Sequence, residues 1–301
     1  MSLETKERGK IRYVYDYAAL SRLREERCSA SIEAGPEATV SGGHAHVAME
    51  RHPAATGYEL AACAAEQFKY VVHGSLTADR DGRILRVPRG HILHIPAGMA
   101  HGLAAGPEED AEVVAVTDTR VSAGGRPRAS GSLVLSTPRS PRASGTEVRY
   151  VYPIDELDHV PEGRSSAVIS PKNFVSGKSS SYGASLKGEM LQVGLIRKPR
   201  GSGAKLHTHP NEQFNLVLEG RLVGEIGGYP MEVPAGSIIH MPPKVEHCTL
   251  ASPDGDVTFF VVKDTSHGMA GPPVDGIEDG PRYLPGFGPA TAPKAGGSNN
   301  G

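Results

Sequence analysis

The chain has little of what several protein classes need. It contains no tryptophan, and aromatic residues make up only 5% of its 301 residues. No stretch approaches the roughly 20 apolar residues of a membrane helix, and the start of the sequence is charged, so we expect neither a membrane span nor a secretory leader. The formal net charge is only −2. That balance gives no strong field for nucleic acid or for an anionic membrane surface.

Cysteine is also scarce. Cys28, Cys63 and Cys248 are the only three, and an odd number without CxxC spacing argues against a disulfide framework or a cysteine-based zinc site. We therefore expect reduced thiols and a cytoplasmic location. In contrast, the chain has 37 glycines and 24 prolines. This abundance favours many short strands joined by turns over a helical protein.

The sequence contains an internal repeat. A shift of 146 residues carries Glu66-Gln67-Phe68 onto Glu212-Gln213-Phe214. The same shift superposes further glycine, proline and histidine residues: Gly74 on Gly220, Gly82 on Gly228, Pro88 on Pro234, Gly90 on Gly236, His94 on His240, Pro96 on Pro242 and His101 on His247. The chain is therefore expected to hold two copies of one structural unit.

Short strand-like runs, interrupted by glycine and proline, indicate a barrel or a sandwich in each copy. In the second copy the runs are 190–197, 205–209, 213–218, 237–241 and 257–262. An amphipathic stretch before each copy, 17–26 and 154–160, predicts one short helix each. We expect an all-β fold of two tandem barrels, with an N-terminal barrel at 1–121, a linker at 122–146, a C-terminal barrel at 147–270 and a flexible tail at 271–301.

A histidine pair in the second copy indicates a metal site. Alternate residues of a strand face the same side, so His207 and His209 are expected to project together into the barrel, and Lys205 with them. Two such imidazoles make half a metal site. Gln213 follows at the start of the next apolar run, and His247 comes after a proline-rich turn.

These residues resemble the two motifs of the cupin superfamily. His207, His209, Gln213 and Gly220 fill the first motif, with glutamine where the family usually has an acid, and Gly228, Pro234, Gly236 and His247 fill the second. The resemblance implies a jelly-roll barrel, or double-stranded β-helix, in each half. It also implies one divalent transition metal ion (Fe, Mn, Ni or Zn) bound by His207, His209 and His247 with Gln213.

Gln213 would be a neutral ligand and would leave the full metal charge available as a Lewis acid. Its repeat partner Gln67 is kept in the other copy, so a packing role for glutamine at this position stays open.

The N-terminal copy departs from the motif. Ala61 and Cys63 stand where the C-terminal copy has its histidine pair, and only Gln67 and His101 remain. One histidine and one glutamine do not hold a divalent ion, and a single thiolate adds little. We therefore expect this barrel to have lost its metal and to serve a structural or substrate-shaping role.

A second histidine pair, His44 and His46, also matches the first motif. The repeat places it on the preceding strand, opposite Met190 and Gln192, so we interpret the match as a coincidence. The alternative is a second ion held by this pair and His101.

Three further side chains are candidates for catalytic roles. Lys205 could clamp a substrate carboxylate or simply lie at a strand end. Asn215 could hydrogen-bond a metal-bound ligand or be a satisfied core polar group, and Glu246 could shuttle a proton or face solvent. His240 has a counterpart, His94, in the metal-free copy, which argues for a structural or interface role.

Three function classes follow. The first, preferred because it is frequent in the family, is a dioxygenase-type oxidoreductase acting on a small oxygenated organic acid or aromatic compound. The second is a redox-neutral isomerase or lyase of an oxo acid or sugar acid. The third is a non-catalytic module that binds a small ligand. For an enzyme we expect a small-molecule substrate, no nucleic-acid or membrane partner, and a homodimer.

Overall fold

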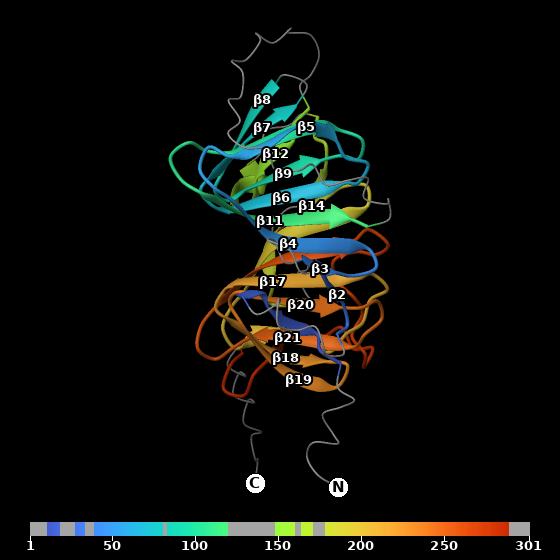
Figure 1. Ribbon diagram of the computed structural model, residues 1–301. Helices are drawn as coiled ribbons and strands as arrows, with labels where there is room; N and C mark the ends of the chain where they lie inside the picture. The colour runs from blue at the N-terminus through green and yellow to red at the C-terminus, as the bar shows by residue number, and fades with distance from the viewer. Residues whose placement is uncertain are drawn as a thin grey trace, which may run out of the picture.

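The computed structural model describes residues 11–18, 28–33, 39–80, 83–119, 148–159, 164–170 and 178–288. They form two β-barrels, one above the other in Figure 1. The N-terminal half contributes β1 (Val14–Asp16), β2 (Ser31–Glu33), β3 (Thr39–Ser41), β4 (Ala45–His52), β5 (Gly57–Ala62), β6 (Gln67–His73), β7 (Ser75–Arg80), β8 (Arg83–Pro88), β9 (His91–Ile95), β10 (Ala100–Ala105) and β11 (Ala111–Asp118).

The C-terminal half has the same plan. Its elements are β12 (Val151–Pro153), η2 (Ile154–His159), β13 (Val168–Ser170), β14 (Tyr182–Lys187), β15 (Leu191–Lys198), β16 (Ser202–Gly203), β17 (Gln213–Glu219), β18 (Arg221–Ile226), β19 (Tyr229–Pro234), β20 (Ser237–Met241), β21 (His247–Ala251), β22 (Val257–Asp264) and β23 (Arg282–Tyr283). The predicted all-β fold of two jelly-roll barrels is confirmed.

Each barrel is built from a large and a small sheet. The large sheets have the strand orders β12-β9-β6-β11-β4-β3-β2 and β1-β20-β17-β22-β15-β14-β13, and the small ones β5-β10-β7-β8 and β19-β18-β21-β16-β23. The strand ladders keep the 146-residue shift. Ala61 pairs with His101 as His207 bridges to His247, and His46 pairs with Thr117 as Gln192 pairs with Lys263.

The two halves exchange their first strands. β1 lies beside β20 of the C-terminal barrel, with Val14 opposite Ile239, and β12 lies beside β9 of the N-terminal barrel, with Val151 opposite Leu93. Each half therefore completes the sheet of the other. The boundaries expected at 121 and 147 stay predictions, but the packing units do not follow chain order at these two strands.

The largest apolar cluster joins the two barrels. It contains residues from both large sheets, and the rings of Tyr70 and Phe260 stack across the boundary with centroids 5.1 Å apart. Each barrel has a smaller cluster of its own between its two sheets. The burial of such clusters is the main favourable contribution to folding, and here the two barrels share the largest one.

Two buried carboxylates connect the barrels at related positions. Glu66 accepts hydrogen bonds from the backbone N–H groups of residues 189, 190 and 191. Glu212 does the same for the N–H groups of residues 43 and 44. His94 and His240 contact these carboxylates at 2.9 Å through Nε2, which supports the interface role predicted for the histidine pair.

Several local expectations differ from the structure. Residues 205–209 form no regular strand but an irregular segment, in which His207 bridges to His247 and to Pro273. The predicted helix at 154–160 is a 3-10 helix, η2. The predicted helix at 17–26 lies mostly, and the linker at 122–146 entirely, outside the described residues.

Residues 271–288, expected in a flexible tail, pack on the C-terminal barrel. There β23 pairs with β16, and Val274 N–H donates to the Leu206 carbonyl oxygen at 2.9 Å. None of the described helices is long and apolar enough to cross a membrane.

Candidate metal centre

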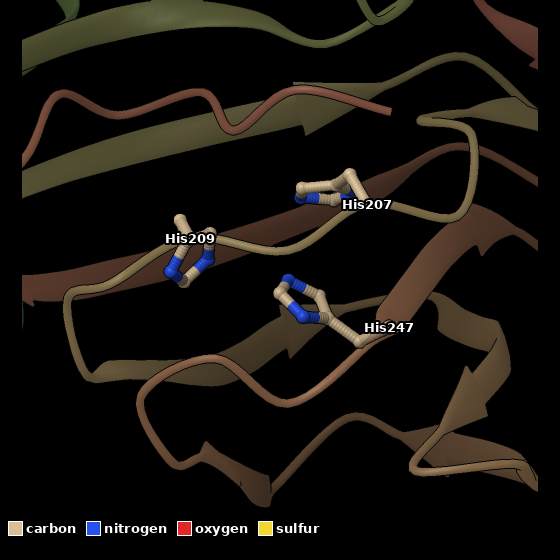
Figure 2. A group of neighbouring side chains, drawn as sticks. All are labelled: His207, His209 and His247. Carbon is tan, nitrogen blue, oxygen red and sulfur yellow. The ribbon is translucent and has the colours of Figure 1, made fainter. Parts of the chain in front are cut away.

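Three histidines converge inside the C-terminal barrel. His247 begins β21, and His207 and His209 come from the irregular segment between β16 and β17. One ligand nitrogen from each ring can be chosen such that all three lie within 4.8 Å of one another. Figure 2 shows the three rings turned toward a common point. Within the described residues, this is the one cluster of three or more histidine, cysteine or acidic side chains with metal-binding geometry.

The three rings all use Nδ1 to bond a backbone carbonyl. His207 Nδ1 lies 2.8 Å from the Lys205 carbonyl oxygen, His209 Nδ1 2.8 Å from that of Asn211, and His247 Nδ1 3.0 Å from that of Val245. A carbonyl only accepts, so each Nδ1 carries the proton and each Nε2 keeps its lone pair. The buried His247 Nε2 has no partner within the described residues. The donor set therefore fits a metal ion.

The surroundings keep all three imidazoles neutral. Burial lowers the pKa of His207 to about 4 and that of His209 to about 3, and the charge of Lys263 adds to both shifts. Burial, with His207 and His209 nearby, lowers the pKa of His247 well below its usual value. Since only neutral imidazole binds a metal, the site is ready for one at neutral pH.

Gln213 adds an oxygen to the same point. Its Oε1 lies 3.1 Å from His209 Nε2, and its Nε2 donates to Asn215 Oδ1 at 2.8 Å. Because the proton of His209 is on Nδ1, two lone pairs face each other across that 3.1 Å, an arrangement that a cation between them stabilises. Asn215 is fully buried, and its Nδ2 has no partner within the described residues.

Two lysines that sequence reasoning missed lie in the same cavity. Lys198 and Lys263 are 3% and 2% exposed and line the cavity together with His207, Gln213 and Asn215. The alternation of residues along a strand could have revealed them. Lys198 lies two residues after Ile196, and Lys263 lies two after Val261, so each lysine shares the cavity-facing side of its strand.

The other two predicted catalytic residues, Lys205 and Glu246, are less buried than Asn215. Lys205 is at the rim of the cavity, where its ammonium pairs with Asp275 at 3.1 Å and with Asp279. Glu246 is exposed. The acids that pair with Lys205 belong to residues 269–280, a segment that lines the mouth of the cavity with Met269, Pro273 and other residues. We call it the mouth segment.

The corresponding positions in the N-terminal barrel carry side chains that do not form a three-histidine cluster. Gln67 Nε2 donates to Cys63 Sγ at 2.9 Å, and His101 Nε2 is buried without a partner among the described residues. Lys69, the counterpart of Asn215, pairs with both oxygens of buried Glu50 at 2.7 Å. His46 Nδ1 instead contacts Ser41 Oγ at 2.6 Å, and no described trio joins His44, His46 and His101.

Comparisons with known proteins agree with this architecture. Residues 195–263 match the Cupin domain family. The structure of oxalate decarboxylase from Bacillus subtilis aligns with a TM-score of 0.55 at 15% identity, covering 84% of this chain and 76% of that chain. AerE from Microcystis aeruginosa aligns with a TM-score of 0.54 at 14% identity, covering 79% and 97%. Residues 195–263 thus match a Cupin domain, and the described residues have the two-barrel fold of these structures.

One curated protein adds a similarity in sequence. Dimethylsulfoniopropionate lyase DddW from Ruegeria pomeroyi is 35% identical over 65 residues, which cover 22% of this chain and 43% of that protein. The match thus spans less than half of the length of this relative.

Proposed function

We propose that the chain is a mononuclear metal-dependent enzyme that acts on a small oxygenated organic acid. The observation that carries the proposal is the convergence of three neutral imidazoles whose Nδ1 protons are all donated to backbone carbonyls. Gln213 would be the fourth ligand. A bound divalent ion, iron, manganese, nickel or zinc, would supply Lewis-acid polarisation of a substrate oxygen.

We favour redox-neutral chemistry, that of a lyase or isomerase. Four neutral ligands leave the whole charge of the ion to the substrate, which suits polarisation of a carbonyl or carboxylate. The similarity to a lyase whose substrate, dimethylsulfoniopropionate, is a carboxylate supports this choice. The second candidate is a dioxygenase-type oxidoreductase, which the same three-histidine centre with open positions would also suit.

The protein's own residues would position the substrate and shield it. Asn215 Nδ2, buried and without a partner among the described residues, can donate a hydrogen bond to a substrate oxygen. The mouth segment lines the cavity. It would limit the access of water to a bound substrate, which strengthens the electrostatic contacts inside. Lys205 would hold this segment rather than the substrate.

Metal content tests the site. We expect about one divalent ion per chain in the wild type, and none in His207→Ala/His247→Ala. The matched control is His101→Ala, because His101 is the N-terminal counterpart of His247, and this variant should keep its ion. Elemental analysis after gel filtration gives the answer. An ion that persists in the double variant would place the metal elsewhere.

Oxygen dependence separates the two reaction classes. Turnover of dimethylsulfoniopropionate, oxalate and a panel of oxo acids should proceed without O2 and with zinc or nickel. Consumption of O2 in step with product, with iron alone, would favour the dioxygenase instead. A homodimer is the expected assembly, and sedimentation equilibrium would test it.

A further inference from the structure

The cavity of the C-terminal barrel contains two buried ammonium groups. Lys198 Nζ donates to the carbonyl oxygen of Thr249 at 2.6 Å and also contacts Thr249 Oγ1. Lys263 Nζ donates to the carbonyl oxygen of Met269 at 2.7 Å. An ammonium has three hydrogens, so each lysine keeps at least one donor for a further partner.

No described carboxylate forms an ion pair with either lysine. The acid that lines the cavity, Glu278, pairs at the rim with Lys178 at 3.0 Å. Asp264, next to Lys263 in sequence, accepts hydrogen bonds from the N–H groups of Glu212 and Ser266 instead. Burial lowers the pKa of both lysines to about 7, as expected for ammonium groups without a counter-ion.

The N-terminal barrel shows what a counter-ion would look like here. Its buried Lys69 is held by both oxygens of Glu50. The position of Glu50 is occupied in the C-terminal barrel by Ile196, which lines the cavity. The C-terminal barrel therefore has more buried positive groups than its counterpart and lacks the acid that balances them.

Both lysines lie close to the candidate metal centre. Lys263 is the cross-strand neighbour of Gln213, which contacts His209. Lys198 contacts Thr249, two residues after His247 on β21 and so on the same face of that strand. A ligand bound at the three histidines would therefore have both ammonium groups beside it in the same cavity.

We propose that Lys198 and Lys263 bind an acid group of the substrate, and that the substrate is a small dicarboxylate. This inference rests on the proposed function, because one carboxylate would lie at the metal and the second at the lysines. A second carboxylate would supply the counter-charge that keeps both lysines protonated, whereas with a monocarboxylate at the metal they would lose a proton or remain as unpaired buried charges.

Binding of matched acids tests the proposal on the metal-loaded full chain. Succinate is compared with butyrate, and glutarate with valerate, by isothermal titration calorimetry. The wild type should bind each dicarboxylate at least about tenfold more tightly than its partner. Lys198→Met and Lys263→Met should each weaken succinate binding about tenfold or more and change butyrate binding less than about threefold, since each removes a charge that only the second carboxylate uses. Lys187→Met, at an exposed lysine of β14, is the control and should match the wild type.

Three readouts keep the failures apart. Elemental analysis of each variant shows whether the ion is retained, and loss of the ion from wild type itself would defeat the proposed function. Circular dichroism shows that the variants fold. Folded, metal-loaded lysine variants that bind succinate as the wild type does would overturn this proposal and leave the metal centre untouched. Equal affinity of the wild type for succinate and butyrate would overturn it as well.

Discussion

The two barrels share one strand register but differ in how the charged side chains of their interiors are paired. In the N-terminal barrel, Lys69 is neutralised by Glu50, with His52 3.2 Å from the same carboxylate. In the C-terminal barrel, three neutral histidines converge, two buried lysines line the cavity beside them, and neither lysine has a described ion-pair partner. The buried lysine of the first barrel is thus paired with an acid inside that barrel, whereas the two buried lysines of the second are not.

This difference distinguishes buried charges that support the fold from buried charges that are available to a ligand. A buried ion pair with both members present adds little to stability but fixes a unique arrangement, while buried charge without a partner costs stability unless a ligand provides the partner. The charge pattern therefore fits a supporting role for the N-terminal interior and, under the proposed function, ligand binding in the C-terminal interior.

What the barrels share is their interface. Each places a carboxylate, Glu66 or Glu212, against the backbone of the other barrel, and each carboxylate is backed by a histidine. Glu212 lies beside Gln213, yet its side chain points to the neighbouring barrel and away from the histidine cluster. Of these two adjacent residues, Glu212 stabilises the interface between the barrels and Gln213 faces the interior of its own barrel.

The largest stability effect is expected in the ion pair of the N-terminal barrel. Glu50→Gln or Lys69→Met should each cost about 3–5 kcal/mol, because one buried charge then lacks its partner. The double variant Glu50→Leu/Lys69→Met should return to within about 1 kcal/mol of the wild type. Urea denaturation followed by circular dichroism measures this. Equal losses in the single and double variants would contradict the pairing, and metal content should stay unchanged throughout.

The same pair predicts an acid-sensitive stability. Burial opposes ionisation of Glu50, but Lys69 and His52 outweigh it and lower its pKa from 4.5 to about 2. A lowered pKa in the folded state stabilises the protein above about pH 4.5, and this contribution, roughly 3 kcal/mol, is lost as pH falls toward 2. Glu50→Leu/Lys69→Met should therefore show a flatter stability profile between pH 5 and 2 than the wild type. Thermal melts across that range would check it.

The interface carboxylates come next. Glu66→Ala and Glu212→Ala should each destabilise the chain by about 2–3 kcal/mol, since each leaves buried backbone N–H groups without an acceptor. Glu66 accepts from three backbone N–H groups and Glu212 from two, so the loss should be greater at Glu66. Denaturation measures both, and Glu219→Ala, an exposed acid of β17, is the control. A smaller loss at Glu66 than at Glu212 would contradict this ranking.

The sequence predicted what depends on the repeat. Glycine, proline and histidine at one spacing located the barrels, aligned His207 with Ala61 and His209 with Cys63, and assigned the pair His44 and His46 to the preceding strand. The ladders confirm this register and place His46 in β4, whereas His44 lies just before that strand begins. Such positions are predictable because each copy is a check on the other.

Features that depend on distant partners could not be predicted in this way. The strand exchange leaves no local signal, because β1 and β12 have nearly the same sequence and would suit either barrel. Lysines are rarely buried, so Lys198 and Lys263 were passed over despite their place in strand alternation. Lys205 was expected in a regular strand, and its acidic partners lie some seventy residues later in the chain.

The smallest effect is expected at Lys205, and it shows whether this lysine holds the mouth segment or contacts the substrate. If Lys205 only holds the mouth segment through Asp275 and Asp279, Lys205→Met should lower kcat/KM less than about threefold, because exposed ion pairs contribute little. Asp275→Asn/Asp279→Asn should then produce a similar change. A drop of more than about tenfold in Lys205→Met alone would instead indicate that this lysine clamps the substrate. The comparison of the two variants in one turnover assay decides between a residue that closes the cavity and one that contacts its ligand.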